Sequence, residues 1–284
     1  MQPLKPGKPP RRAAYALPTL FTSGNIFLGF LAIVQAFEGA MQAGTGDLGP
    51  NQHFSLAAKA LGFSVFFDGL DGRIARMTHT TSDFGRELDS LADVVTFGIA
   101  PAILAFVWGV RYVISAEPSV ESNLIRAGYL VVFFYLLCGA VRLARFNIQK
   151  PQPSGRPDYK YFVGMPIPAA AAFIAAVVYM DDAPVRSLAF AVTWLVIIGL
   201  IGLLMVSTWR YPSLKQVNIT KPRTPLFVLI VGGFAFLIWE WSQPFLLALS
   251  SAYVVSGIAI RAGSFMRRRR KPRAPVAEQQ LGRS

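Results

Sequence analysis

The sequence contains few charged residues and a single cysteine. Asp, Glu, Lys and Arg together make up 15% of its 284 residues, whereas soluble domains average about 25%. The one cysteine, Cys138, lies in an apolar stretch and cannot form a disulfide within the chain. These deficits, together with an apolar content of 53%, exclude a disulfide-rich secreted domain, a disordered chain and a collagen-like chain.

Long apolar runs account for the low charge. A helix needs about 20 apolar residues to cross a bilayer, and runs of that kind, bounded by charge or by Pro and Gly, recur along the chain. They predict helices near residues 17–37, 54–77, 86–108, 124–144, 164–180, 187–207, 225–239 and 243–262. The last two are separated by a very short turn around Glu240, so six helices plus a re-entrant hairpin is the alternative. The expected fold is an all-α, polytopic membrane helix bundle of about eight transmembrane helices.

The distribution of positive charge predicts how this bundle sits in the membrane. The net charge is +13, which in a soluble protein would suggest a nucleic-acid partner. With eight crossings and the N-terminus inside, however, 24 of the 28 Lys and Arg residues fall in cytoplasmic segments, as the positive-inside rule requires. The run Arg267–Lys271 then lies at the membrane surface, where each cation contributes about 1 kcal/mol of attraction to anionic lipid. We expect both termini on the cytoplasmic side of the cell inner membrane, contact with membrane lipids and no nucleic-acid partner.

Four aspartates occur where membrane helices ordinarily carry none. Asp68 and Asp71 are three residues apart near the end of the second predicted helix, and Asp89 and Asp93 are four apart near the start of the third. Either spacing places both members of a pair on one helix face, so two antiparallel helices can point both pairs at a common centre. Four carboxylates in one pocket repel one another strongly unless cations neutralise them. All-oxygen ligands favour Mg²⁺ or Mn²⁺, with Ca²⁺ also compatible, and two ions suit four carboxylates better than one.

Small residues and an arginine surround the aspartates. Gly72, Ala75 and Arg76 follow the first pair, and Gly85 precedes the second. Small side chains let a phosphate-bearing ligand approach the backbone closely. Close helix packing is the alternative explanation for the small residues, and ion pairing with nearby arginines is the alternative for the aspartates. Because ion pairs do not require two matched carboxylate pairs, a metal-bound diphosphate is the favoured interpretation.

These residues form the pattern D-x-x-D-G-x-x-A-R, eight residues, then G-x-x-x-D-x-x-x-D, which resembles the signature of the CDP-alcohol phosphatidyltransferase family. Its eight fixed positions are all filled, by Asp68, Asp71, Gly72, Ala75, Arg76, Gly85, Asp89 and Asp93. The resemblance implies a six-helix catalytic core, usually in a homodimer, followed here by two C-terminal helices. It also implies metal-dependent transfer of a phosphatidyl group from a CDP-linked lipid to an alcohol, with release of CMP, at the cytoplasmic face.

Further segments resemble the members of this family that use serine as the alcohol. They cover residues 17–25, 80–98, 142–147, 162–168 and 204–207, so the resemblance runs from about residue 15 to about residue 215. The expected organisation has four parts. A basic cytoplasmic leader occupies 1–16, the CDP-alcohol phosphatidyltransferase transmembrane core 17–207, a cytoplasmic loop and two C-terminal helices 208–262, and a basic cytoplasmic tail 263–284.

The resemblance also implies roles for individual residues. By it, the four aspartates bind the metal ions and Asp93 is in addition the catalytic general base, although spacing alone does not decide which of the four accepts the proton. The residues expected to contact the CDP-lipid are Asn25, Gly72, Ala75, Arg76, Ser82 and Gly85. Asn25, at the inner end of the first helix, has an equally good alternative role in a hydrogen bond between helices.

Two arginines are the candidates for binding the second substrate. Arg142 and Arg145 are three residues apart at the inner end of the fourth predicted helix, so they share a face. A guanidinium group matches a carboxylate or a phosphate through two parallel hydrogen bonds, and serine carries a carboxylate. The alternative is that both arginines merely follow the positive-inside rule.

The expected function is transfer of the phosphatidyl group from CDP-diacylglycerol to the hydroxyl of L-serine. Two alternatives stay open. The same chemistry on glycerol 3-phosphate or inositol phosphate would call for more cations in the pocket. A cation-coupled membrane transporter would also use buried carboxylates, although transporter sites usually lie at the bilayer midplane rather than near helix ends.

Overall fold

The computed structural model describes residues 12–77, 83–148, 161–212, 237 and 240–270, and almost all of them are helical. The helices are α1 (Arg12–Gly44), α2 (Gln52–Met77), α3 (Asp83–Asp93), the π-helix η1 (Val94–Ile99), α4 (Ala100–Gly109), α5 (Pro118–Ile148), α6 (Ile167–Met180), α7 (Leu188–Val206) and α9 (Ser242–Arg270). Two three-residue strands, β1 (Tyr161–Val163) and β2 (Arg210–Pro212), pair antiparallel. The predicted all-α fold is confirmed.

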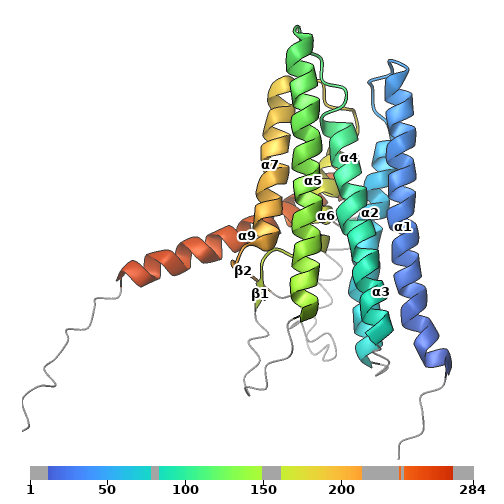
Figure 1. Ribbon diagram of the computed structural model, residues 1–284, viewed down its shortest axis with the longest axis vertical. Helices are drawn as coiled ribbons and strands as arrows, with labels where there is room; N and C mark the ends of the chain where they lie inside the picture. The colour runs from blue at the N-terminus through green and yellow to red at the C-terminus, as the bar shows by residue number, and fades with distance from the viewer. Residues whose placement is uncertain (1–11, 78–82, 149–160, 213–236, 238–239, 271–284) are drawn as a thin grey trace, which may run out of the picture.

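Most of the helices stand side by side in one bundle, whereas α9 leaves it at a steep angle (Figure 1). Five helical stretches are long and apolar enough to cross a membrane: residues 20–44, 84–109, 118–148, 188–206 and 242–261. Helix α6 is apolar as well but has only 14 residues. Large apolar side chains such as Phe30, Phe133 and Leu200 are exposed on the outside of the bundle, as expected where lipid replaces water. The protein is an integral membrane protein.

The observed helices agree with the predicted ones in place and differ in length. Helix α1 continues to Gly44, and α5 begins at Pro118, a residue whose fixed φ suits the first turn of a helix. Both extensions are more polar than the apolar runs, because a helix does not have to end where the hydrocarbon does. The predicted helix at 225–239 falls almost wholly outside the described residues.

One continuous helical rod, formed by α3, η1 and α4, changes from α-helical to π-helical geometry in its middle. Helices α3 and α4 are joined without a break by η1, where the N–H of Ala100 bonds the carbonyl of Val95 instead of that of residue 96. Such π-segments release carbonyl groups from the regular ladder and often occur at functional sites. The carbonyl of Phe97 accepts a hydrogen bond of 2.9 Å from the Tyr135 hydroxyl of α5. Its partner in a regular α-helix would be residue 101, which is proline and has no N–H to donate. The rod is thereby tied to α5 just after Asp93.

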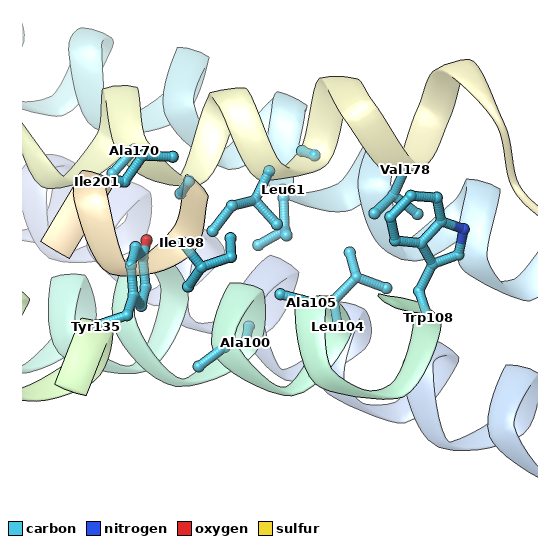
Figure 2. Close-up of a cluster of buried hydrophobic side chains, with 14 of the residues drawn as sticks. Leu61, Ala100, Leu104, Ala105, Trp108, Tyr135, Ala170, Val178, Ile198 and Ile201 are labelled. Atoms are coloured by element: carbon cyan, nitrogen blue, oxygen red, sulfur yellow. The ribbon is translucent and has the colours of Figure 1, made fainter. Parts of the chain in front are cut away.

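The core of the bundle lies between α2, α4, α6 and α7 (Figure 2). It is filled by Leu61, Leu104, Trp108, Ile198 and Ile201 with small alanines between them. Small residues bring the helices close together, which is how membrane helices gain packing energy in the absence of a water-driven term.

The strand pair is anchored to the end of α7 by a sharp turn. Gly164 has φ +79°, and a Cβ there would run into the backbone of Met205, so only glycine fits. Its N–H bonds the carbonyl of Trp209 at 2.8 Å, and the N–H of Met165 bonds the carbonyl of Leu204 at 3.0 Å. This turn joins two segments, 162–168 and 204–207, that are far apart in the sequence.

Candidate active site

Three aspartates meet where the end of α2 faces α3, the helix labelled toward the lower end of the bundle in Figure 1. Asp68 comes from α2, and Asp89 and Asp93 come from successive turns of α3. A carboxylate oxygen from each lies within 4.8 Å of the other two. Asp68 and Asp89 are half-buried, and Asp93 is 9% exposed. The prediction that α2 and α3 direct their carboxylates at a common centre is confirmed for these three residues.

Helix α1 holds the two aspartate-bearing helices in place. Phe67, the residue before Asp68, packs against Phe21 of α1 with ring centroids 6.0 Å apart. On its other side α1 meets η1, where Gly29 leaves room for Thr96, whose Cα would lie 2.8 Å from a Cβ at position 29. A larger residue at position 29 would separate α1 from the segment that follows Asp93.

The chemistry of this cluster fits a divalent cation. Three carboxylates within 4.8 Å of one another repel strongly unless a cation lies among them. The donors are all oxygens, the ligand type that Mg²⁺, Mn²⁺ and Ca²⁺ prefer. The side chain of Asp71 lies outside the described part of α2, so the fourth predicted ligand is not tested.

Asn25 of α1 is a buried polar residue whose backbone contacts η1. It is 0% exposed, and neither its amide nitrogen nor its side-chain oxygen has a hydrogen-bond partner among the described residues. Its backbone carbonyl accepts a hydrogen bond of 3.1 Å from the Thr96 hydroxyl, three residues beyond Asp93. A buried amide without partners costs about 1–3 kcal/mol. The contact between α1 and η1 therefore uses the backbone of Asn25 and not its side chain.

The two candidate arginines have different surroundings. Arg142 is half-buried near the end of α5 and lies in the neighbourhood of the Asp93 carboxylate and of Tyr253. Its Nε is buried and has no hydrogen-bond partner among the described residues. Arg145, one turn further along α5, is exposed. Only Arg142 is thus brought to the aspartates.

The remaining predicted site residues are placed only in part. Gly85 lies in α3, one turn before Asp89. Gly72, Ala75 and Arg76 lie in the last turns of α2, where the side chains are not described. Ser82 lies outside the described residues.

Sequence reasoning missed two tyrosines near Arg142. Tyr253 of α9 lies in the neighbourhood of Arg142, and Tyr211 of β2 stacks on Tyr253. Burial raises the pKa of the Tyr211 hydroxyl, which therefore stays protonated. No spacing or motif connects residues 142, 211 and 253, and only the docking of α9 brings them together.

The comparison with known families agrees with this geometry. The profile of the CDP-alcohol phosphatidyltransferase family matches residues 15–201, about two thirds of the chain. The chain belongs to this family. It is therefore an enzyme of phosphatidyl transfer, and the match includes all three clustered aspartates and Arg142 but ends before β2 and α9.

Several relatives in this family have similar sequences. A CDP-diacylglycerol–serine O-phosphatidyltransferase of Helicobacter pylori is 35% identical over 255 residues, which cover 88% of this chain and 92% of the relative. An enzyme of the same name from Bacillus subtilis is 33% identical over 202 residues, 70% of this chain and 92% of the relative. An archaetidylserine synthase of Methanothermobacter thermautotrophicus is 33% identical over 199 residues, 69% of this chain and 70% of the relative. None of these comparisons supports the transporter alternative.

Proposed function

We propose that this enzyme transfers the phosphatidyl group from CDP-diacylglycerol to the hydroxyl of L-serine, forming phosphatidylserine and CMP. The observation that carries the proposal is the meeting of three carboxylates within 4.8 Å, with Arg142 close to one of them. The relatives named for serine transfer support serine as the acceptor. A phosphorylated acceptor would need more positive charge than the half-buried Arg142 supplies.

The four aspartates 68, 71, 89 and 93 are the proposed metal ligands. Two Mg²⁺ or Mn²⁺ ions, with Ca²⁺ also compatible, suit their oxygen donors. When bound, such ions would neutralise the diphosphate of the CDP-lipid and stabilise the charge on departing CMP. The cluster of Asp68, Asp89 and Asp93 supports this assignment because a cation among the three carboxylates relieves their mutual repulsion.

Asp93 is the proposed general base. Serine attacks the β-phosphorus through its hydroxyl oxygen, and Asp93 accepts the hydroxyl proton as the new phosphorus–oxygen bond forms. The bond between that phosphorus and the bridging oxygen breaks, and CMP leaves with the bridging oxygen and its electron pair. Such proton transfer contributes about 10²–10⁴-fold to the rate. Asp93 is favoured over Asp68 and Asp89 because it is the most deeply buried of the three and lies close to Arg142.

The CDP group is proposed to bind beside α1 and the end of α2. Its expected contacts are Asn25, Gly72, Ala75, Arg76, Ser82 and Gly85. The partnerless, fully buried amide of Asn25 supports this, because a nucleotide base or phosphate could satisfy both its donor and its acceptor. The acyl chains need no polar contacts and would lie against the apolar outer face.

Arg142 is proposed to bind the serine carboxylate. We expect Arg142→Ala to raise the KM for serine about 10- to 100-fold, the effect of losing hydrogen bonds to a charged group worth about 1.5–3 kcal/mol. The KM for CDP-diacylglycerol should change far less. Arg145→Ala should act in the same direction but more weakly, because its side chain is exposed. Steady-state kinetics with each substrate varied in turn measures both KM values. Equal rises in the two KM values would indicate that these arginines only follow the positive-inside rule.

The active site is proposed to face the cytoplasm, with both termini on the same side of the cell inner membrane. The 24 Lys and Arg residues in the segments expected inside support this orientation. A homodimer, expected from the family resemblance, is likewise proposed.

Product formation tests the proposed reaction directly. Purified protein in detergent micelles containing CDP-diacylglycerol, Mn²⁺ or Mg²⁺ and labelled L-serine should form labelled phosphatidylserine and one CMP per product. Glycerol 3-phosphate and inositol phosphate, each added in excess, should compete poorly with serine. Absence of labelled lipid at every metal concentration would refute the proposal. Efficient use of a phosphorylated acceptor would show that the enzyme has a different acceptor specificity within the family.

A further inference from the structure

A small cavity lies at the end of the bundle away from the aspartates. Its volume is about 280 Å³, near the lower limit of pockets that hold small ligands, about 300–1,000 Å³. Its walls come from Leu48 in the loop after α1, Trp108 in the last turn of α4, the loop between α6 and α7, and Phe190 of α7. Trp108 and Asp93 are 15 positions apart on one continuous helical rod, which is about 22 Å. The cavity is therefore separate from the candidate active site.

Trp108 brings an unused hydrogen-bond donor to this cavity. The residue is 1% exposed, and its indole nitrogen has no hydrogen-bond partner among the described residues. Figure 2 shows that nitrogen on the side of the ring turned away from Leu104 and Ala105. The indole of the neighbouring Trp194, in contrast, donates to the Ala105 carbonyl at 3.0 Å. An indole N–H can only donate, and an unpaired one inside the protein costs about 1–3 kcal/mol. A ligand with an acceptor atom would remove this cost.

The start of α7 supplies further donors to the same cavity. Ser187 precedes the helix and makes no capping hydrogen bond with its side chain. The first N–H groups of a helix lack partners within it and carry partial positive charge, so they attract anions. Arg186 also lines the cavity, and its guanidinium donates to the carbonyl of Leu48. A guanidinium has five N–H donors, so most of them stay available. Together with the Trp108 indole, these groups suit a phosphate.

An acidic side chain, Asp181, lines the cavity as well. Its carboxylate accepts a hydrogen bond of 3.2 Å from the N–H of Ala183. Within the described part of the chain, Asp181 and Arg186 form no ion pair with each other. Asp181 would repel a ligand that carries only negative charge. A ligand that carries both a phosphate and an ammonium group matches the two charged side chains.

The cavity lies at the edge of the hydrocarbon layer. One apolar span, 84–109, ends at this cavity, and another, 188–206, begins there. Lipid headgroups occupy the zone just outside the hydrocarbon core, and tryptophan is enriched at that depth. Phe190, on the membrane-spanning side of the cavity, is 48% exposed, so an acyl chain can pack against it. These positions favour a phospholipid over free phosphate.

We propose that this cavity binds the headgroup of a zwitterionic phospholipid, one that carries a phosphate and an ammonium group, from the leaflet on the far side of the membrane from the aspartates. The phosphate lies among the Trp108 indole, Arg186 and the start of α7. The ammonium group lies beside Asp181, and an acyl chain follows Phe190. A lipid held in this way joins the end of α4, the loop after α1 and the start of α7.

Binding of short-chain lipids to the purified enzyme in detergent tests the inference. Dihexanoylphosphatidylethanolamine should raise the Tm of the wild-type protein as its concentration increases, because a ligand that binds only the folded state stabilises it. Dihexanoylphosphatidylglycerol, which lacks the ammonium group, should raise the Tm less at the same concentration. Inorganic phosphate, which lacks both the ammonium group and the acyl chains, should leave the Tm unchanged.

Replacement of the cavity residues locates the binding. Arg186→Gln should weaken the apparent affinity for the ethanolamine lipid about five- to tenfold, as expected for the loss of a hydrogen bond from a charged group. Arg126→Gln is the matched control, because Arg126 is exposed in the first half of α5 and does not line the cavity; it should keep the wild-type affinity. Asp181→Asn should abolish the preference for the ethanolamine lipid over the glycerol lipid.

Trp108→Phe removes the indole N–H and keeps an aromatic ring, so it should also weaken binding of the ethanolamine lipid. Because Trp108 is almost fully buried, this variant must first be shown to bind CMP. If it does not fold, Ser187→Ala replaces it, since Ser187 is exposed, and a smaller loss of affinity is expected.

The contrary results are distinct from failure of the proposed reaction. Equal affinity of the wild-type protein for the two lipids, or a rise in Tm with inorganic phosphate alone, would overturn the zwitterionic lipid as the ligand. Equal affinity of Arg186→Gln and the wild type for the ethanolamine lipid would overturn the site itself. None of these measurements requires turnover, so they hold whichever alcohol the enzyme uses.

Discussion

Asp93→Asn is expected to abolish turnover while leaving nucleotide binding largely intact. The amide has nearly the same shape as the carboxylate but cannot accept a proton, so the loss in kcat should reach at least about 10²–10⁴-fold. Asp68 and Asp89 remain beside it to hold positive charge near the diphosphate. The turnover number from labelled serine and the dissociation constant for CMP from calorimetry measure the two effects separately.

Asp47→Asn is the matched control for this substitution. Asp47 lies in the loop after α1, at the end of the bundle away from the aspartate cluster, and its carboxylate accepts hydrogen bonds from Gln42 at 2.8 Å and from the N–H of Gly49 at 3.2 Å. These two bonds lower the pKa of Asp47 but place it in no contact with the proposed site. Its replacement should leave kcat unchanged. Residual chemistry in Asp93→Asn at the wild-type rate, with nucleotide binding lost, would assign Asp93 to binding and not to proton transfer.

Removal of divalent cations is expected to stop the reaction and to destabilise the site. Chelation should reduce product formation to background, and Mn²⁺ or Mg²⁺ should restore it. Because an ion that binds only the folded protein stabilises it by mass action, added Mn²⁺ should also raise the Tm of the metal-free protein. This second readout depends on the carboxylates and not on substrate.

Charge-removing variants locate the ion. Asp68→Asn and Asp89→Asn should each weaken the rise in Tm with Mn²⁺, since the carboxylate oxygens of these residues lie within 4.8 Å of each other. Asp181→Asn, an exposed carboxylate between α6 and α7, should respond like the wild type. Full activity in excess chelator, or the same rise in Tm in all three variants, would contradict a metal site at the aspartates.

Most of the architecture was predictable because a membrane helix is determined by the residues within it. A run of about 20 apolar residues has few alternatives in a bilayer, and seven of the eight predicted ranges correspond to described helices. The spacing of Asp89 and Asp93 requires a shared helix face. Spacing alone does not decide which way that face points within the bundle. The second pair of carboxylates, on α2, made a common centre the simplest interpretation.

Other features had no local signal. In the π-helix after Asp93, the Thr96 hydroxyl donates to the backbone of Asn25 in α1, and the carbonyl of Phe97 accepts a bond from Tyr135 in α5. No pattern in residues 94–99 predicts these partners. The two candidate arginines near the end of α5, Arg142 and Arg145, look alike in the sequence, yet of these two only Arg142 approaches Asp93. Equally, the partnerless side chain of Asn25 is known only once its neighbours are in place.

The amino-acid sequence by itself determined that this protein is a membrane helix bundle and that its chemistry lies with four aspartates at fixed spacing, because helix formation in lipid and the facing of residues three or four apart are local properties. Tertiary structure alone decided which side chains share the site with the aspartates. Contacts such as the stacking of Tyr211 on Tyr253 and the hydrogen bond from Thr96 to Asn25 join segments 42 and 71 residues apart. They depend on how helices dock, a property that no single stretch of sequence contains.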